Sequence, residues 1–318
     1  MAMKLLIKTT VLSVREEAEG VRSFVLVPAK RPVLPPFQPG AHVIVQVPNG
    51  LRRVYSLCSD PADDTRWRIA VLREPAGLGG SACMHDNVRE GTSLFVTYPD
   101  NHFPLDQEAG RHIFIAGGIG ITPFLPMVIQ ARRMSAPFEL HYCSRSASRA
   151  AFTGELEALC PPRTFFPHYD GGNPSEGLNI PQLLEKAETG THVYACGPAG
   201  MLDAVRRASA QWPSTQVHYE AFSGLPIDQL SRGEPFRIRI ASSGQLIEVG
   251  ESKSARTALG EAGFAIDAVC ERGVCGTCKV RYVAGEPVHR DSALMPTERA
   301  SHFVTCVSRA RGEIKLDL

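Results

Sequence analysis

Cys270-Glu271-Arg272-Gly273-Val274-Cys275-Gly276-Thr277-Cys278 is the stretch that decides the fold of the last quarter of the chain. Its cysteines stand with four and then two residues between them, and a fourth cysteine, Cys306, follows much later. This spacing is typical of the thiolate ligands of a plant-type [2Fe–2S] cluster. Gly273 and Gly276 let the backbone approach the sulfur atoms and point N–H groups at them. Buried free cysteines and a zinc site are the two alternative interpretations.

The bulk composition restricts the classes of protein to consider. A length of 318 residues suggests two or three domains, and 43% hydrophobic and 21% charged residues are ordinary for globular proteins. A net charge of +1 gives no general electrostatic reason to expect a nucleic acid or membrane partner. No apolar run approaches the roughly 20 residues of a membrane span. Nine cysteines without a recognisable secretion signal favour a reducing, cytoplasmic compartment.

The first segment, residues 1–107, is predicted to form an antiparallel β-barrel. Its short stretches of alternating polar and apolar residues are separated by clusters of Pro and Gly, as in all-β domains. The predicted strands include residues 23–27, 42–47, 67–72 and 93–97.

The second segment, residues 108–223, alternates strand and helix patterns and predicts an α/β domain with a parallel sheet covered on both faces. The expected strands are residues 113–116, 139–143, 163–168 and 192–195, and the expected helices are 124–134, 153–159, 180–187 and 201–212.

Residues 224–234 are polar with Pro and Gly, and we interpret them as a linker. The final segment, residues 235–318, begins with predicted strands 236–241 and 245–249 and a helix at 255–262, followed by the cysteine loop. This order is typical of a small α+β domain of the β-grasp type.

A glycine-rich turn, Gly117-Gly118-Ile119-Gly120-Ile121-Thr122-Pro123, follows a predicted strand and opens a helix. Gly117, Gly118 and Gly120 allow a tight turn and close approach to a pyrophosphate, while Thr122 is expected to cap the helix with Pro123 at its first position. The helix N-terminus would then present N–H groups to phosphate. The turn lacks the G-x-G-x-x-G spacing of Rossmann dehydrogenases, and a plain strand–helix turn is the alternative.

A second turn, Cys196-Gly197-Pro198, follows the last long strand of this segment. It is expected at the carboxyl edge of the parallel sheet, where ligands bind in open α/β folds. Cys196 is predicted to line a nicotinamide site and to act there, although a buried, inert cysteine is the simpler alternative.

A flavin site is predicted on the strand Arg52-Arg53-Val54-Tyr55-Ser56-Leu57. Arg53 can pair with a phosphate, Tyr55 offers a flat face to a ring system, and Ser56 can hydrogen-bond a ring nitrogen. Gly80 and Ser81 precede a predicted helix at residues 82–88 and form a candidate phosphate site. The candidate flavin contacts also include Val54, Ala70 and Leu72. An exposed strand and a Gly-rich loop are the respective alternatives.

Taken together and in this order, the motifs resemble the phthalate dioxygenase reductase family, which includes the vanillate demethylase reductases. The resemblance rests on the following motifs: Arg53-x-Tyr55-Ser56-Leu57, Gly79-Gly80-Ser81, Phe103-Pro104-Leu105, Gly117–Pro123, Cys196-Gly197-Pro198, the four ligand cysteines and His289-Arg290-Asp291. It implies that the barrel binds FMN, the central domain binds NADH and the last domain is a [2Fe–2S] ferredoxin. It also implies that Phe222 closes the flavin site, for which interdomain packing is the alternative.

The resemblance implies an enzyme that passes electrons from NADH through FMN and the cluster, one at a time, to a partner oxygenase. The expected partner is a Rieske-type non-haem iron enzyme. A stand-alone ferric or quinone reductase and a flavin and iron–sulfur redox sensor are the rival functions. NADPH also stays open, because Arg145 and Arg149 follow the strand at 139–143. A further hypothesis is a basic docking rim for the oxygenase, made of Arg272, Lys279, Arg281, Arg309 and Arg311.

Overall fold

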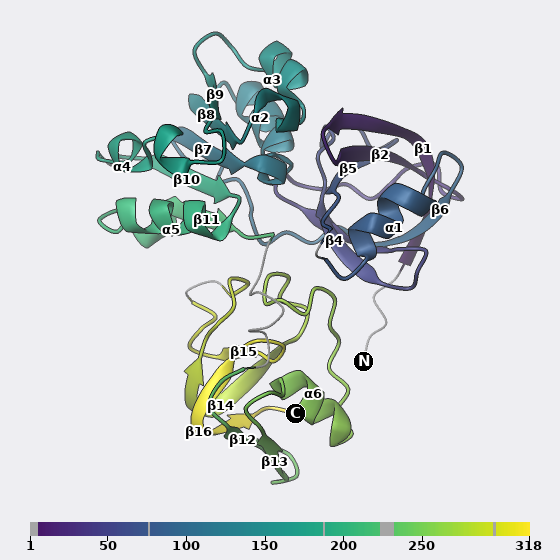
Figure 1. The fold of residues 1–318 in the computed structure, drawn as a ribbon, viewed down its shortest axis with the longest axis vertical. Helices are drawn as coiled ribbons and strands as arrows, with labels where there is room; N and C mark the ends of the chain where they lie inside the picture. The colour runs from purple at the N-terminus through teal and green to yellow at the C-terminus, as the bar shows by residue number, and fades with distance from the viewer. Residues whose placement is uncertain (1–5, 76, 187, 223–231, 295–296) are drawn as a thin grey trace. The chain divides into compact units, whose positions relative to one another are not determined.

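The computed structural model describes residues 6–75, 77–186, 188–222, 232–294 and 297–318. The chain divides into two compact units, residues 1–220 and 221–318. The first unit contains two β-sheets and the second contains one (Figure 1). Most of the predicted linker at 224–234 lies outside the described residues. Within the described ranges, none of the helices has the length and apolar character needed to span a bilayer.

The first sheet is an antiparallel barrel of six strands in the order β4-β3-β6-β1-β2-β5. The strands are β1 (Leu6–Ala18), β2 (Val21–Pro28), β3 (His42–Gln46), β4 (Arg52–Ser56), β5 (Trp67–Leu72) and β6 (Ser93–Thr97). A bridge between Leu57 and Ile69 joins the end of β4 to β5 and closes the sheet. Alternate residues point inward and form a core around Trp67, Phe24 and Leu26. Helix α1 (Gly80–Asn87) adds Cys83 and Met84 to that core.

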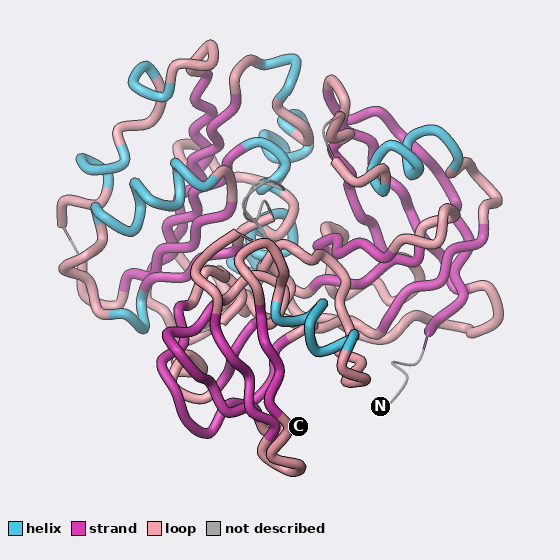
Figure 2. The backbone as a smooth tube through the Cα atoms, turned by 60° about the horizontal axis from the view of Figure 1, so that its bottom comes forward, coloured by secondary structure: helices cyan, strands magenta, loops and turns pink. Residues whose placement is uncertain are grey.

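The second sheet is fully parallel, with the order β11-β10-β7-β8-β9. Its strands are β7 (Arg111–Gly117), β8 (Phe138–Ser144), β9 (Phe165–Tyr169), β10 (Thr191–Cys196) and β11 (Val217–Glu220). Helices lie on both sides of it (Figure 2). They are α2 (Phe124–Arg133), α3 (Thr153–Leu159), α4 (Ile180–Leu183) and α5 (Ala199–Ala208), with short 3-10 turns at Gly118–Ile121, Ala147–Arg149, Pro174–Glu176 and Ser214–Gln216. In chain order, β7 is the first strand of this sheet and β10 is the fourth. The two are neighbours in the sheet, so the strand order reverses between them.

Two predicted helices differ from those found. The helix expected at 180–187 ends at Leu183, and the helix expected at 201–212 begins at Ala199 and ends at Ala208. In the first case only one turn forms, where Pro181 fits and Asn179 accepts a hydrogen bond from the N–H of Gln182. Helix ends depend on caps that hydrophobic periodicity does not reveal.

Among the described residues of the first unit, three ion pairs join the barrel to the domain of the parallel sheet. Arg68 donates two hydrogen bonds to Glu155, at 2.8 and 2.7 Å. Arg133 makes the same forked contact with Asp60, at 2.7 and 2.6 Å. Arg149 lies 3.1 Å from a carboxylate oxygen of Glu19. Forked arginine–carboxylate pairs fix orientation as well as distance, so they hold the two sheets in one arrangement.

The second unit contains a five-stranded mixed sheet in the order β13-β12-β16-β14-β15 and one helix. Its elements are β12 (Phe236–Ile240), β13 (Leu246–Val249), α6 (Ala255–Glu261), β14 (Lys279–Val288), β15 (His302–Val304) and β16 (Arg309–Leu316). Strands β12 and β16 are parallel, and the helix packs Ala255, Ala258 and Leu259 into the core of the sheet. The predicted architecture of barrel, parallel α/β sheet and small α+β domain is therefore confirmed.

Arg309 is a structural residue of this unit rather than part of a docking rim. Its side chain is only 5% exposed and donates hydrogen bonds to four carbonyl groups, those of Lys253, Gly233, Glu234 and Gly250. Its guanidinium also lies 4.8 Å from the centre of the Phe236 ring. Lys279 pairs with Glu298 at 2.6 Å. Because Arg309 is buried and Lys279 is paired, we remove both from the five residues of the proposed docking rim.

We predict that Arg309→Met destabilises the second unit by about 3 kcal/mol or more, because several buried carbonyl groups lose a charged donor. Urea unfolding of the full chain, followed by the visible absorbance of the cluster, measures the shift. The exposed Arg281→Met is the matched control and should change the free energy of unfolding by less than about 0.5 kcal/mol. Equal shifts in the two variants would contradict the structural role of Arg309.

A buried histidine makes the first unit sensitive to acid. His112 is fully buried, its ring stacks on Phe114, and neither ring nitrogen has a hydrogen-bond partner among the described residues. Burial, with a smaller effect of His192, lowers the pKa of His112 to about 4. An unfolded histidine binds its proton near pH 6.5, so stability is lost as the pH falls from about 6.5 towards 4.

His112→Phe removes this titration. We predict that the variant gains about 2 kcal/mol relative to the parent chain between pH 7.5 and pH 5, at 1.36 kcal/mol per pKa unit. Thermal unfolding of both proteins at the two pH values measures the change. A difference that stays constant with pH would show that His112 does not contribute to acid sensitivity.

Candidate functional site

The cysteine loop directs backbone N–H groups at its own sulfur atoms. The N–H of Arg272 donates to Cys270 Sγ at 3.4 Å, and Val274 makes a second backbone hydrogen bond to the same sulfur. The N–H of Gly273 donates to Cys306, which comes from the segment after β15. These hydrogen bonds favour the thiolate form that a metal requires. The structure therefore brings together all four of the predicted ligands.

The four thiols are close enough to share protons. A hydrogen bond from Cys270 lowers the pKa of Cys275, and a hydrogen bond from Cys306 lowers the pKa of Cys278. The same contacts raise the pKa of the two donors, Cys270 and Cys306. Cys278 and Cys306 are buried in an apolar cluster with Leu294, Val304 and Val307. Four converging thiols in a mostly dry pocket with backbone donors fit a [2Fe–2S] cluster.

Glycine is required at Gly273 because φ is +77° and a Cβ atom would lie 2.5 Å from Val307 Cγ2. Asp291 and its neighbour Ser292 hold the loop by hydrogen bonds. Asp291 is 7% exposed, its carboxylate accepts hydrogen bonds from Ser308 Oγ and the N–H of Leu294, and the neighbouring Ser292 N–H donates to the Gly273 carbonyl. Asp291 of the His289-Arg290-Asp291 motif therefore supports the cluster loop.

The two turns predicted to bind the dinucleotide follow β7 and β10, on either side of the reversal in strand order. They pack against each other: a Cβ atom at Gly117 would lie 2.6 Å from Pro198 Cδ, and one at Gly120 would lie 2.3 Å from the Cys196 carbonyl oxygen. Gly197 meets the Gly117 backbone in the same way. Gly118, with φ +54°, has no protein atom within 4 Å of its Cβ position among the described residues. Gly117, Gly120 and Gly197 thus allow the two turns to make contact. Of the glycines in these two turns, Gly118 is the one whose backbone stays accessible to a ligand.

The prediction that Thr122 caps helix α2 is wrong. Thr122 has helical dihedral angles, and Pro123 occupies the capping position. A 3-10 turn at Gly118–Ile121 precedes the helix, and the Thr122 hydroxyl donates back to the Ile119 carbonyl at 3.1 Å. The hydroxyl is thus used within the turn rather than on the helix N–H groups.

Arg53 lies directly against the N-terminus of α1. A Cβ atom at Gly80 would come within 2.6 Å of Arg53 Nε, and Arg53 Nη2 is buried with no hydrogen-bond partner among the described residues. A buried guanidinium nitrogen beside a helix N-terminus suits a phosphate group. Ser81 Oγ, in contrast, accepts a hydrogen bond from the Glu74 N–H at 3.0 Å.

Tyr55 lies on the same side of β4 as Arg53 and packs against the barrel core. Its hydroxyl is buried without a hydrogen-bond partner among the described residues, and burial raises its pKa. Val54 and Ser56 point to the opposite side of the strand. Ala70 is buried and Leu72 is 38% exposed, and both alternate with the core residues of β5.

Glu220 is a functional candidate that the sequence analysis missed. It ends β11, where it pairs in register with Cys196, and its carboxyl interacts with Ser56 of the barrel. Neither Ser56 Oγ nor Glu220 Oε2 has a properly aligned hydrogen-bond partner among the described residues. Burial raises the pKa of Glu220 to about 8. Its position at the carboxyl edge of the last parallel strand is the sequence signal that could have identified it.

Cys196 is fully buried, and burial together with the nearby Glu220 raises its pKa well above the usual range. A thiol in these surroundings stays protonated at neutral pH, so it does not act as a nucleophile. Phe222 is half-buried, two residues beyond the end of β11.

Comparison with known families agrees with this arrangement. Residues 238–311 match the model of the 2Fe-2S iron-sulfur cluster binding domain. Residues 114–207 match the oxidoreductase NAD-binding domain. The chain therefore carries an iron–sulfur domain and a nicotinamide nucleotide domain, as predicted.

Several characterised relatives match nearly the whole chain. The reductase subunit of tert-butanol monooxygenase / tert-amyl alcohol desaturase from Aquincola tertiaricarbonis is 42% identical, over 94% of this chain and 92% of the relative. The heme-dependent oxidative N-demethylase beta subunit of Ectopseudomonas mendocina is 41% identical, over 99% of this chain and 100% of the relative. Phthalate dioxygenase reductase of Burkholderia cepacia is 38% identical, over 98% and 97%.

A solved structure of phthalate dioxygenase reductase has a TM-score of 0.75 at 37% identity and covers 98% of both chains. An intact type IV self-sufficient cytochrome P450 monooxygenase has a TM-score of 0.86 at 34% identity, but this chain covers only 41% of it. With identity well above 30% along almost the full length of several relatives, this chain belongs to the phthalate dioxygenase reductase family.

Proposed function

We propose that this chain accepts hydride from NADH on FMN and delivers electrons singly, through its [2Fe–2S] cluster, to a separate oxygenase. The observation that carries the proposal is four of the buried polar atoms that lack a well-aligned hydrogen-bond partner within the described part of the first unit: Arg53 Nη2, Tyr55 Oη, Ser56 Oγ and Glu220 Oε2. Buried polar atoms are costly unless something satisfies them, so three such atoms on the single short strand β4 favour a bound polar ligand. When bound, the flavin supplies the exchange between two-electron and one-electron chemistry.

Arg53 and the N-terminus of α1 would bind the flavin phosphate. The single guanidinium and one short helix suit a terminal phosphate, which supports FMN as the flavin. Gly80 keeps the approach to Arg53 open, since any side chain there would collide with the guanidinium. Val54, Tyr55, Ala70 and Leu72 are proposed as contacts to the ring system.

The turns after β7 and β10 would hold NADH at the strand reversal of the parallel sheet. Gly118 offers its backbone to the pyrophosphate, while Thr122 and Gly117–Gly120 maintain the shape of the turn. Cys196 would line the nicotinamide site as a buried, neutral thiol. NADH is favoured over NADPH because Arg149, one of the two arginines that could meet a 2′-phosphate, pairs with Glu19.

Ser56 and Glu220 would orient the reacting end of the flavin ring by hydrogen bonds. Glu220 would also hold a proton beside it. With a pKa of about 8, Glu220 carries a proton at neutral pH. Its carboxyl can then donate a hydrogen bond, and Ser56 interacts with the same carboxyl. A neutral carboxyl also avoids placing negative charge beside a ring that must accept hydride.

The external partner is proposed to be a Rieske-type non-haem iron oxygenase, with Arg272, Arg281 and Arg311 as the remaining candidates for a docking rim. A haem oxygenase is the second candidate. It is favoured by the 41% identity to a heme-dependent oxidative N-demethylase beta subunit and by the similarity to a cytochrome P450 monooxygenase. Product formation by each class of oxygenase with this chain as the only electron source separates the two.

The cluster cysteines can be tested without disturbing the first unit. We predict that Cys275→Ser keeps NADH oxidation with a two-electron dye acceptor within about twofold, because the flavin is untouched. Product formation by the coupled oxygenase should fall at least 100-fold. Equal oxygenase turnover in the variant and the parent would show that electrons leave from the flavin, as in a stand-alone quinone or ferric reductase. Slow dye turnover in the parent chain would favour a redox sensor.

The role of Glu220 predicts a pH profile. The rate of flavin reduction by saturating NADH, measured by stopped flow, should fall above about pH 8 as Glu220 loses its proton. Glu220→Gln keeps a neutral, hydrogen-bonding side chain, so it should retain most of the rate at pH 7 and lose this pH dependence. Glu157→Gln, on the surface of α3, is the matched control. An unchanged profile in Glu220→Gln would contradict the assignment.

A further inference from the structure

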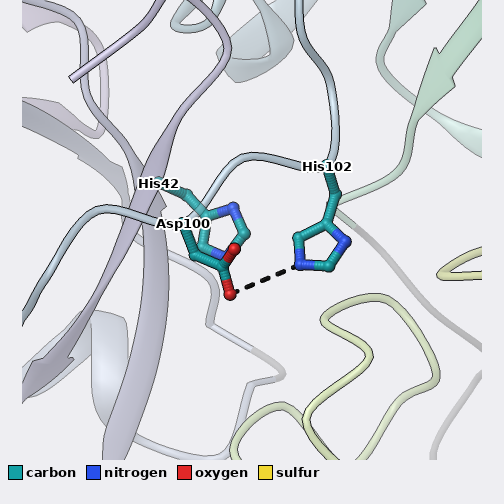
Figure 3. A group of neighbouring side chains, drawn as sticks. All are labelled: His42, Asp100 and His102. Atoms are coloured by element: carbon teal, nitrogen blue, oxygen red, sulfur yellow. Dashed lines mark ion pairs between the residues drawn. The ribbon is translucent and has the colours of Figure 1, made fainter.

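Three potential metal ligands meet in the first unit, and none of them is a cysteine of the proposed cluster. His42 is the first residue of β3, and Asp100 and His102 follow β6 in the segment that leads to the parallel sheet. Figure 3 shows that the two imidazoles and the carboxylate lie together. One ligand atom from each residue lies within 4.8 Å of the other two. His102 Nε2 is 3.4 Å from Asp100 Oδ2, and the two histidine rings are stacked with centres 5.6 Å apart.

The backbone fixes this arrangement. The His42 N–H donates to the Asp100 carbonyl at 2.8 Å, and the Asp100 N–H donates to the His42 carbonyl at 2.9 Å. A reciprocal pair of this kind places both side chains on the same face of an antiparallel bridge. His102, two residues after Asp100, can return to that face. The Asn101 N–H also donates to Asp100 Oδ1 at 3.0 Å, which leaves Oδ2 toward His102.

The segment is also anchored just beyond the three residues. Phe103 is 2% exposed and packs edge-on against Phe124 of α2 and Tyr194 of β10. Its carbonyl lies so close to Gly40 that a Cβ atom there would be 1.9 Å away. The ligand-bearing segment is therefore held by the barrel before the site and by the parallel sheet after it. Such support is what keeps metal ligands in place before the ion binds.

The donor set selects a class of ion. Imidazole nitrogen and carboxylate oxygen suit first-row divalent ions such as Zn²⁺, with bond lengths of about 2.0–2.2 Å. In a tetrahedral site of that size neighbouring ligand atoms are about 3.3–3.5 Å apart. The distance between His102 Nε2 and Asp100 Oδ2 already meets this condition. The ligand atom of His42 lies within 4.8 Å of the other two, and a water would complete the coordination.

We propose that His42, Asp100 and His102 form a binding site for a first-row divalent transition metal ion. The bound ion would link β3 to the segment between β6 and β7, which connects the barrel to the nucleotide-binding sheet. This inference does not depend on the proposed electron-transfer function. A hydrogen-bonded cluster of polar side chains that takes no ion is the alternative that the experiment must exclude.

Zinc titration of the full chain, with its flavin and iron–sulfur cluster in place, tests the site. A chromophoric chelator competes for Zn²⁺, and X-ray absorption at the zinc edge identifies the bound atoms. We expect one zinc ion per chain with nitrogen and oxygen neighbours at about 2.0–2.1 Å rather than sulfur at about 2.3 Å. Asp100→Asn and His102→Gln should each weaken binding at least tenfold. Asn at position 100 can still accept the hydrogen bond from Asn101.

Two other histidine pairs provide matched controls. His141 and His168 have ring nitrogens 3.1 Å apart, as do His192 and His218. His168→Gln and His218→Gln should leave the zinc affinity unchanged, and the visible spectrum confirms that each variant keeps its cofactors. Weaker binding in either control with normal binding in His102→Gln would overturn the proposal. Sulfur neighbours at the zinc, or no binding at millimolar Zn²⁺, would do so equally.

Discussion

The contact between the turns after β7 and β10 is the constraint on which the first unit depends. Gly117, Gly120 and Gly197 bring two backbone segments together at the point where the order of the parallel strands reverses. Any side chain at these positions would collide with backbone or with Pro198 and Met201. The register of β10 with β11 places Cys196 beside Glu220, and Gly118 is the open part of the turn. The proposed nucleotide site and the Glu220 carboxyl therefore lie at the same edge of the parallel sheet.

A different constraint governs the second unit. The four cysteine side chains converge, and as thiolates they would repel one another. Backbone N–H groups of Arg272, Val274 and Gly273 offset part of that repulsion, and Gly273 is needed for the loop to turn towards them. Asp291 and Arg309 use buried charge for structure alone, by binding backbone and hydroxyl groups around the loop and the sheet. Buried charges of this kind are tolerated because most of their polar atoms are hydrogen-bonded.

Local patterns predicted the three architectures, most strand positions and the four cluster ligands, because cysteine spacing and the alternation of apolar residues are local signals. They did not predict Glu220, whose importance comes from Ser56, far away in the sequence and brought close only by the fold. They misplaced Thr122, since a 3-10 turn competes with the expected cap for its hydroxyl. Arg309 was misread as a surface charge because a sequence does not show which carbonyl groups surround a side chain. The three ion pairs between barrel and parallel sheet were invisible for the same reason.

The central claim is that one chain takes electrons in pairs from NADH and holds them on a flavin and a [2Fe–2S] cluster. Anaerobic titration of the purified protein with NADH, followed by its visible spectrum, tests it most directly. A two-electron flavin and a one-electron cluster together take up three electrons, so both absorbances should bleach with about 1.5 NADH per chain. Bleaching of the flavin alone by one NADH, with a cluster that is present but stays oxidised, would contradict the account.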